Sequence, residues 1–432
     1  MPDLLLGQTL AFDADPFAHG PGAARHEPRG GVLIADGRIA AVGTAAALRT
    51  AHPGARVRDY GRALISAGFV DCHMHYPQTG IIASWGRRLI DWLEGYTFPE
   101  EMRLADPAQA AATAALACDL ALDHGTTTLA SYCTSAAHSV DAFFEAAAAR
   151  GMRVVAGRTC MDRNAPPGLL DTPEAAVAES AALIARWHGR GRAVYAITPR
   201  FAPTSSPEQM AALGRLWAAH PDCAMQTHLS EQTEEVAWVA GLFPGARDYL
   251  DVYDGFGLVG PGAVFGHAIH LGAREVARLA AAGAGVAHCP TSNSFIGSGL
   301  CDVAGLKAAG VAVGLATDTG GGSSFSMLRT MAAAYEVGQL RGHALHPAQL
   351  WWLATAGSAD VLRLGDRIGR LAVGREADVV VVDLASTPGI AQRAARADGL
   401  WEALFPTIMM GDDRAIRAVW VDGTCRRDRA AG

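Results

Sequence analysis

Apolar and polar positions follow a repeated pattern through most of the chain. Short apolar runs typical of buried strands alternate with alanine-rich stretches of helical periodicity. The pattern begins with the apolar run 63–75, the alanine-rich stretch 107–124 and the apolar run 125–132. Strand and helix continue to alternate over about 300 residues. This repetition predicts a parallel sheet closed into a (β/α)8 barrel of the TIM type.

Further segments continue the same alternation. In pairs of a helix and the strand after it, they are residues 139–150 and 152–159, 173–189 and 193–201, 207–220 and 223–231, 273–283 and 284–292, and 302–310 and 311–319. One more apolar run, 262–267, precedes the fourth of these pairs.

The two ends of the chain have a different, β-rich pattern. Residues 30–43 contain two short apolar runs on either side of Asp36 and Gly37, which is a typical hairpin signal. Near the other end, β-branched runs at 377–384 and 416–424 are separated by turns. We therefore expect the two ends to pair with each other as a small second domain.

Composition supports this division and excludes some partners. Of the 432 residues, 50% are hydrophobic and 18% are charged, which is enough for a large core. The net charge is −7 and no basic run stands out, so we expect no nucleic-acid partner. No apolar stretch approaches the ~18 residues that span a bilayer, so we expect no membrane partner. The predicted domains are a barrel at 66–369 and a second domain made of 1–65 plus 370–432.

The cysteines and the first residues indicate a cytoplasmic protein. The eight cysteines form no CxxC pair, which is typical of reduced thiols in a chain of this length. The opening MPDLLLGQTLAFDADP lacks the basic start of a signal peptide.

Residues that commonly bind metals end several predicted strands. His73 and His75 end the first run, His228 and His267 end two later runs, and Asp318 ends the last run. The carboxyl ends of barrel strands meet at the active site, and side chains two apart on a strand face the same way. An HxH pair alone is weak evidence, because two histidines at a strand end can be ordinary polar residues. With three more such residues the pattern predicts a metal site, and its donors suit Zn²⁺, with Fe²⁺ also fitting.

The order of these residues resembles the amidohydrolase superfamily over essentially the whole chain. The resemblance rests on DCHMH (71–75), followed by His228, His267 and Asp318. Members of this superfamily combine the barrel with a small β-sandwich that both chain ends build. The resemblance therefore implies a β-sandwich as the second domain.

The metal content expected from the resemblance is one ion per chain. Binuclear members carry a carboxylated lysine at the end of the fourth strand, although a glutamate replaces it in some. The only lysine here is Lys307, which lies in a predicted helix. The string THLSE (227–231), in which Glu231 follows His228 by three residues, resembles the mononuclear deaminase branch.

Five longer motifs resemble members of this branch that act on guanine. They are HMHYPQT (73–79), LIDWLEGYTFPEE (89–101), DRNAPPGLLDT (162–172), ITPRFAPTSSPEQM (197–210) and HCPTSNSFIGSG (288–299). The resemblance implies hydrolytic deamination of guanine to xanthine and ammonia by a metal-activated water, and by analogy a homodimer. The alternatives are an aminohydrolase of the same branch that acts on a pterin, a triazine or an adenosine derivative, and a metal-free scaffold protein. The complete set of ligand-type residues disfavours the scaffold.

The resemblance assigns roles around the metal. His73, His75, His228 and Asp318 are expected to bind it, and His267 either binds it or hydrogen-bonds the water. His270 competes with His267, but the two have opposite parity on a strand and cannot both face inward. Asp318 is also expected to accept a proton from the water.

Glu231 is expected to carry protons between the water, the ring and the leaving ammonia. Without the resemblance, a glutamate at a helix start that the macrodipole favours is an equally good interpretation.

Residues that contact the substrate are expected on several segments. Arg200 closes a predicted strand and would need an acceptor, such as the carbonyl of a purine. Gln78 offers both a donor and an acceptor to a purine edge, and Phe201 and His228 complete the contacts. A surface arginine and an ordinary loop glutamine are the plainer interpretations of the first two.

Two other segments carry weaker signals. Trp92 and Leu93 are expected to wall the pocket, with core packing as the alternative. The glycine-rich segment 317–328 lacks the GK[ST] ending of a phosphate loop, so we do not interpret it as one.

Overall fold

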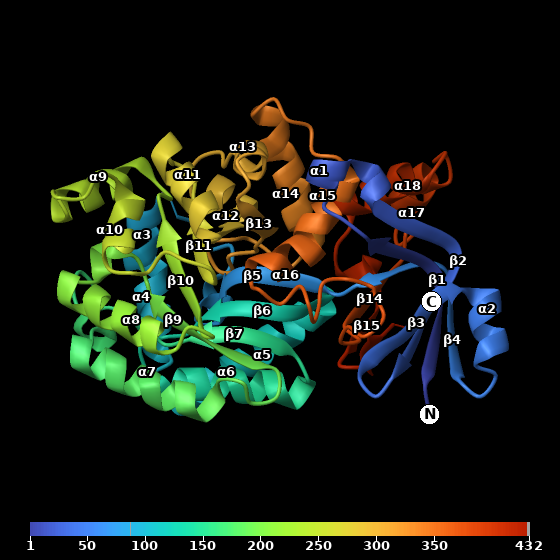
Figure 1. The fold of residues 1–432 in the computed structure, drawn as a ribbon, viewed down its shortest axis with the longest axis horizontal. Coiled ribbons are helices and arrows are strands. Elements are labelled where there is room, and N and C mark those ends of the chain that lie inside the picture. Colours follow the sequence, from blue (N-terminus) through green and yellow to red (C-terminus); the bar gives the residue numbers. More distant parts are fainter. Residues whose placement is uncertain (87, 430–432) are drawn as a thin grey trace.

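A barrel and a separate sheet lie side by side in the computed structural model, which describes residues 1–86 and 88–429 (Figure 1). The barrel strands are β5 (Phe69–His75), β6 (Thr126–Tyr132), β7 (Arg153–Gly157), β9 (Ala193–Pro199), β10 (Ala224–Leu229), β11 (Ala263–His267), β12 (Gly285–His288) and β13 (Ala312–Leu315). Neighbours in this order pair in parallel, and the short β8 (Thr159–Cys160) pairs with β9. The predicted barrel is confirmed.

Helices surround the barrel strands (Figure 1). They are α5 (Pro107–Asp123), α6 (Ala137–Arg150), α7 (Pro173–Trp187), α8 (Pro207–Ala219), α9 (Thr233–Leu242), α10 (Tyr249–Gly255), α11 (Ala273–Ala282), α12 (Pro290–Phe295), α13 (Val303–Ala308), α14 (Met327–Leu340), α15 (Pro347–Trp352) and α16 (Ser358–Val361). Short helical turns in the connections are η2 (Tyr76–Ile81), η4 (Pro167–Leu169), η5 (Ala202–Thr204) and the π-turn η6 (Leu353–Gly357).

Local sequence explains where several of these helices begin. α5, α7 and α8 each start with proline, and the residue before each proline caps the helix. The side chains of Asp106, Thr172 and Ser206 accept hydrogen bonds from backbone N–H groups of the first turn. Proline has no N–H to leave unpaired there, so this pair of residues is a strong start signal.

The barrel closes through backbone hydrogen bonds beyond the end of β13. The Asp318 N–H donates to the His73 carbonyl oxygen at 3.0 Å, and the His75 N–H donates to the Thr319 carbonyl oxygen at 2.6 Å. We expected Asp318 at the end of a strand, but β13 ends three residues before it. The closing bonds nevertheless bring Asp318 beside the two histidines of β5.

The apolar run 63–75 does not form the single strand that we expected. It divides at Gly68 into β4 (Arg56–Ala67), which joins the second sheet, and the barrel strand β5. A Cβ at Gly68 would lie 2.4 Å from the side chain of Thr127, so the division point has room only for glycine.

The two faces of the barrel strands are buried in different surroundings. Leu129 of β6 belongs to the large apolar cluster that also contains residues of the outer helices. The next residue, Ala130, belongs to a second cluster of mostly small strand residues, together with Val155 and Ala196. Because successive side chains alternate across a strand, this second cluster is the inner face of the barrel.

Both chain ends contribute to one seven-stranded sheet, which confirms that they pair. Its order is β16-β15-β14-β4-β1-β2-β3, with both parallel and antiparallel neighbours. Its elements are β1 (Asp3–Phe12), α1 (Pro16–His19), η1 (Pro21–Ala23), β2 (Ala24–Ala35), β3 (Arg38–Thr44), α2 (Ala45–Ala51), β4, β14 (Val379–Val382), α17 (Pro388–Ala394), α18 (Leu400–Met410), η7 (Asp413–Ala415), β15 (Ile416–Val421) and β16 (Thr424–Asp428).

The expected hairpin lies between β2 and β3. Asp36 and Gly37 form its turn with positive φ angles of 50° and 74°. Two consecutive positive φ values match the right-handed twist of the paired strands. In the part of the chain that the structure describes, no helix is long and apolar enough to cross a membrane.

A helical segment between β5 and α5 covers the carboxyl end of the barrel strands. It runs through α3 (Leu89–Trp92), a π-turn η3 (Leu93–Thr97) and α4 (Phe98–Arg103). Single π-turns inside helices occur often at functional sites. We call residues 89–103 the covering segment.

Candidate active site

Imidazoles and one carboxylate converge at the carboxyl end of the barrel strands. His75 Nε2 lies 3.1 Å from His228 Nε2. Asp318 Oδ1 lies 3.3 Å from His73 Nε2 and 3.4 Å from His75 Nε2. All four side chains are buried. The structure therefore brings together the four residues that we expected to bind a metal.

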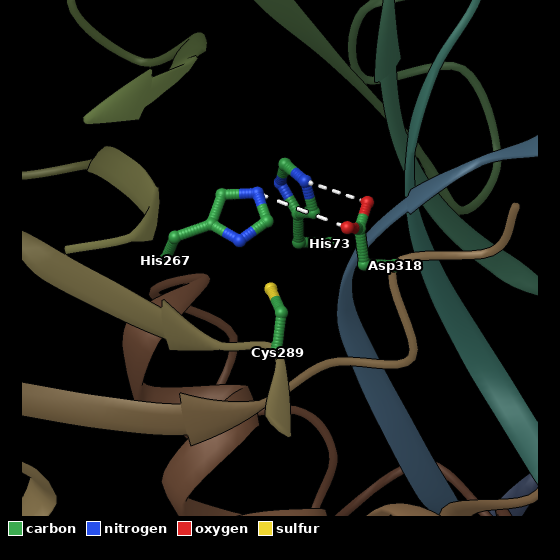
Figure 2. A group of neighbouring side chains, drawn as sticks. All are labelled: His73, His267, Cys289 and Asp318. Carbon is green, nitrogen blue, oxygen red and sulfur yellow. Dashed lines mark ion pairs between the residues drawn. The ribbon is translucent and has the colours of Figure 1, made fainter. Parts of the chain in front are cut away.

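His267 lies on the other side of this group. Its Nε2 is 3.8 Å from Asp318 Oδ2 and 3.5 Å from Glu231 Oε2, and its Nδ1 is 2.8 Å from Asn293 Oδ1. Burial lowers the pKa of His267, but the carboxylates of Glu231 and Asp318 outweigh it and the pKa is raised. Figure 2 shows His73 and His267 directed at opposite oxygens of Asp318.

The donor set fits a divalent cation. His73 Nε2 is buried and has no hydrogen-bond partner among the described residues. Burial lowers the pKa of His73, His75 and His228, so these imidazoles are neutral and have a lone pair for a metal. His228 Nδ1 lies 2.7 Å from the Arg200 carbonyl oxygen, which fixes the proton on Nδ1 and leaves Nε2 free.

The charge of Asp318 completes the set. Burial alone would raise the pKa of this carboxyl group, but His73 and His267 lower it well below its usual range. Lys307, in contrast, lies in α13 and pairs with Asp15 at 2.6 Å. The only lysine of the chain is therefore not at this site.

The backbone at the site is strained. His267, Asp318 and Ser230 have positive φ angles of 67°, 49° and 49°. His267 is the middle residue of a three-residue turn, which the Ala268 N–H closes on the Gly266 carbonyl oxygen at 2.9 Å. Such conformations are uncommon outside glycine and concentrate at functional sites.

Gly266 provides space for one of the ligands. A Cβ at this position would lie 2.7 Å from His73 Cε1 and 3.1 Å from His73 Nδ1. The absence of a side chain at Gly266 therefore allows the His73 ring to reach the cluster.

Asp71 ties β5 to the segment after β13. It accepts hydrogen bonds from the Thr317 N–H at 3.0 Å and from the Thr317 hydroxyl group. Burial raises the pKa of Asp71 to about 7, against the effect of these hydrogen bonds. These bonds hold His73 and Asp318, which follow Asp71 and Thr317, in register with each other.

Glu231 is buried at the edge of the cluster. Its Oε1 accepts a hydrogen bond from the Ser298 hydroxyl at 3.1 Å, while Oε2 faces His267. Burial raises the pKa of Glu231 to about 7. A carboxyl group with such a pKa can both accept and donate a proton near neutral pH.

A hydrogen-bond chain connects Glu231 to the covering segment. Gln232 Nε2 donates to Ser298 Oγ at 3.2 Å, and the Leu89 N–H donates to Gln232 Oε1 at 3.4 Å. Because the Ser298 oxygen accepts from Gln232, its own proton is directed to Glu231. These hydrogen bonds therefore fix Glu231 Oε1 as an acceptor and leave Oε2 directed at the imidazole cluster.

A cavity opens onto the cluster. It is lined by His75, Gln78, Leu89, Trp92, Leu93, Thr97, Arg200, Phe201, His228, Glu231, His267, Ser292, Ile296, Asp318 and Gly321. Every residue that we expected to contact substrate is in this lining. Trp92, Leu93 and Phe201 also belong to one apolar cluster with Ile296, so they both wall the cavity and pack with each other.

His270 and His288 are not among the residues that line the cavity. His270 Nε2 is 2.8 Å from the Ser298 carbonyl oxygen. His288 is fully buried, and burial lowers its pKa to about 3. His288 is therefore neutral at physiological pH.

Several residues at the site had no role in our sequence interpretation. Glu101, Asn293 and Ser298 lie inside quoted motifs, but only their contacts with Arg200, His267 and Glu231 show what they do. Cys289 is one of the eight cysteines that the sequence indicates to be reduced thiols. Figure 2 shows its sulfur directed toward His73 and His267, and together with Asp318 they form a candidate metal-binding group. Burial raises the pKa of the Cys289 thiol, which disfavours the thiolate that metals bind.

A parallel barrel with these groups at the carboxyl ends of its strands defines a hydrolase with a candidate metal centre. The model of the amidohydrolase family matches residues 64–425, and residues 30–55 match an imidazolonepropionase-like composite domain of bacteria. The chain belongs to the amidohydrolase family. The resemblance that the motifs predicted is confirmed.

The relatives narrow this assignment. A guanine deaminase of Escherichia coli (strain K12) is 46% identical over 368 residues, which are 85% of this chain and 84% of that protein. The solved structure of E. coli guanine deaminase has a TM-score of 0.96 at 42% identity and covers 99% of this chain and 100% of that one. A guanine deaminase of C. acetobutylicum, solved with guanine in its active site, has a TM-score of 0.89 at 26% identity and covers 98% of this chain and 100% of that one.

Proposed function

We propose that this chain catalyses the hydrolytic deamination of guanine to xanthine and ammonia. One observation carries the proposal: a single cavity is lined by the candidate metal ligands His75, His228 and Asp318, by a buried glutamate and by the polar pair Arg200 and Gln78. The first two groups supply hydrolysis, and the pair supplies recognition of a purine edge. The similarity to guanine deaminases over most of the chain supports the same substrate.

The site would hold one divalent ion, for which we propose Zn²⁺, with Fe²⁺ as the second candidate. His73, His75, His228 and Asp318 would hold it, and the convergence of their nitrogen and oxygen atoms supports this set. When bound, such an ion lowers the pKa of water toward ~7 and makes hydroxide available at neutral pH. No lysine is near to bridge a second ion, which supports one ion per chain.

The protein side chains move the protons. Glu231 Oε2 takes a proton from the attacking water as the new C–O bond forms at the amine-bearing carbon of guanine. Glu231 then gives this proton to a ring nitrogen. The remaining proton of the new C–OH group passes through Glu231 to the amine, so that ammonia leaves as the C–N bond breaks and the C=O bond of xanthine forms. Its raised pKa, about 7, suits both directions of transfer. Asp318 and His267 lie on either side of this path and orient the water.

Arg200 and Gln78 orient the ring. In guanine one ring nitrogen separates the carbonyl carbon from the carbon that loses its amine, so a donor at the carbonyl fixes the direction in which the amine-bearing carbon faces. Arg200 is such a donor, and Gln78 contacts the adjoining edge. Phe201 with Trp92 and Leu93 would enclose the faces of the ring, since all three are buried and line the cavity.

We extend the proposal to a cytoplasmic homodimer. All eight cysteines are free, which suits a reducing compartment. The dimer rests on analogy with the family alone. Light scattering on the purified protein tests it, with about twice the 45.0 kDa of one chain expected.

Ammonia release from several amines tests the substrate. Purified protein is incubated separately with guanine, adenine, cytosine and a pterin. We expect release from guanine and little from the others. Adenine has no carbonyl for Arg200 to contact, and cytosine and the pterin lack the fused five-membered ring of guanine. Turnover of adenine or the pterin without turnover of guanine would favour the alternative aminohydrolases.

Metal analysis tests the cofactor in the same sample. We expect close to one zinc or iron per chain. Two ions per chain would contradict the mononuclear site, and an active protein without metal would contradict the site altogether.

A further inference from the structure

One carboxylate stands directly behind the two proposed recognition residues. Glu101 lies in α4 at the end of the covering segment, and only 2% of it is exposed. It is outside the lining of the cavity, while its partners Arg200 and Gln78 are in it. Glu101 therefore acts on a bound ring only through these two residues.

Glu101 holds the guanidinium of Arg200. Arg200 Nη1 donates to both carboxylate oxygens, at 3.0 Å and 2.8 Å, and both side chains are buried. The guanidinium also lies over the ring of Phe98, 5.6 Å from its centroid. A guanidinium has five N–H donors, so others stay available for a ligand.

Glu101 also decides which way the amide of Gln78 points. Gln78 Nε2 donates to Glu101 Oε1 at 2.9 Å, and the Gly320 N–H donates to Gln78 Oε1 at 3.4 Å. The opposite orientation would place the amide oxygen against a carboxylate oxygen, which has no proton to donate. The amide therefore has one orientation, and the edge that it presents to a ligand is fixed.

The ion pair with Glu101 also neutralises the positive charge of Arg200. A buried guanidinium without a partner attracts an anion strongly, because its field is weakly screened. Paired with Glu101, Arg200 still donates hydrogen bonds but adds no net positive charge to this wall of the cavity.

We propose that Glu101 is the specificity-determining positioning residue of this pocket: it orients Arg200 and Gln78 and makes the pocket prefer a neutral oxopurine over an anionic one. The inference rests on the proposed function in so far as Arg200 and Gln78 contact the purine. Xanthine loses a proton more readily than guanine, so a wall without net charge binds the substrate without retaining the product.

Equilibrium binding of two purines that lack the reacting amine tests the proposal. Hypoxanthine is neutral at neutral pH and urate carries a negative charge, and both have the carbonyl that Arg200 would contact. Calorimetric titration of the zinc-loaded protein gives the ratio of their dissociation constants. Glu101→Gln should shift this ratio toward urate by about tenfold or more, because it leaves the Arg200 charge unpaired. Glu94→Gln, the same change at an exposed position of the covering segment, should not shift it.

Reverse and double variants keep the test decisive if Glu101→Gln does not fold. Arg200→Gln leaves the carboxylate unpaired and should shift the ratio away from urate. The double variant Glu101→Gln/Arg200→Gln has neither charge and should return the ratio close to that of the unaltered protein. Ratios that stay equal in all folded variants, as judged by circular dichroism, would overturn the proposal.

Kinetics separate the two parts of the role. Glu101→Asp keeps the charge but shortens the side chain, so we expect a higher KM for guanine with an unchanged urate-to-hypoxanthine ratio. A ratio that moves as much in Glu101→Asp as in Glu101→Gln would contradict charge as its cause. The binding titrations need no turnover. Absence of guanine turnover in the unaltered protein would therefore refute the proposed function, while the ratio would still report on Glu101.

Discussion

Two buried polar clusters lie at opposite ends of the barrel, and they differ in how their polar atoms are satisfied. At the carboxyl ends of the strands, His73 Nε2 has no hydrogen-bond partner among the described residues, and the Nε2 atoms of His75 and His228 face each other. At the amino ends, Arg153 at the start of β7 and Arg192 just before β9 contact carboxylates of the segment that leads into β14 of the second sheet.

The cluster at the amino ends is internally paired. Glu376 accepts from Arg153 Nε at 2.9 Å and from Arg192 Nε at 3.0 Å. Arg192 also pairs with Asp378, which in turn accepts the Asp422 N–H at 3.0 Å. Burial raises the pKa of Glu376, but the two arginines outweigh it and lower that pKa overall.

The comparison separates a structural cluster from a functional one. Buried polar groups are normally paired, and a paired cluster leaves nothing for a ligand. Converging groups without partners are costly unless a ligand satisfies them. We therefore expect changes at the carboxyl end to reduce activity more than stability, and changes at the amino end to do the reverse.

Removal of the metal should have the largest effect on activity. Dialysis against a chelator should lower guanine turnover by more than about a thousandfold, because water is then no longer activated near neutral pH. Added zinc should restore the activity. The far-ultraviolet circular dichroism should stay unchanged, since the cluster at the amino ends needs no ion. Full activity of metal-free protein would contradict the functional role that we assign to the cluster at the carboxyl ends of the strands.

Glu231→Gln should come next. The amide keeps the shape of the side chain but cannot shuttle a proton, so kcat should fall by about 10²–10⁴-fold. Metal content, measured by atomic absorption, should stay at one ion per chain. Unchanged kcat would exclude Glu231 from the proton path.

Gly266→Ala tests how closely the ligands are packed. The new Cβ would lie 2.7 Å from the ring of His73, so the ring has to move. We expect zinc affinity to fall by about 10–100-fold, as for other changes next to metal ligands. Gly241→Ala in α9 is the matched control, because its Cβ would meet nothing within 4 Å. Equal zinc affinities in the two variants would contradict the packing argument.

Ser298→Ala should have a smaller effect. It removes one hydrogen bond to Glu231, so we expect kcat to fall by about tenfold with unchanged metal content. Thr387→Ala removes a capping hydroxyl at the start of α17 and should leave kcat as it is. A similar loss of kcat in both variants would indicate a general loss of structure.

Glu376→Gln should have the smallest effect on activity and a clear effect on stability. It removes the shared carboxylate of two buried arginines, so the free energy of unfolding should fall by about 3 kcal/mol. Chemical denaturation measures this loss, and kcat and metal content should stay unchanged. A loss of bound metal in this variant would show that the two ends of the barrel are coupled.

Much of the fold could be predicted because its signals are local. The stretch 207–220 shows both helical periodicity and an N-terminal proline, and the observed helix is Pro207–Ala219. The run 63–75 was predicted less well, because an apolar run predicts a strand but not the sheet that the strand joins. Gly68 divides that run only because the Thr127 side chain of a neighbouring strand approaches it.

The residues of the candidate site also divide into those that local sequence predicts and those that only the folded chain brings together. His73, His75, His228, His267 and Asp318 could be predicted because parallel strands in a barrel all end at one face. Glu101 could not, because its partner Arg200 is 99 positions away and the contact depends on how the covering segment folds back. Asn293 and Ser298 could not be assigned for the same reason.

The sequence by itself determined the kind of chemistry, because residue types at strand ends are fixed once the alternation of strands and helices is recognised. Only the tertiary structure decided how these residues act. Closure of the barrel places the carboxylate of Asp318 against two histidines, and the covering segment places Glu101 behind Arg200. Distances, pKa shifts and charge pairing depend on groups that are remote in the chain, and they exist only once the chain has folded.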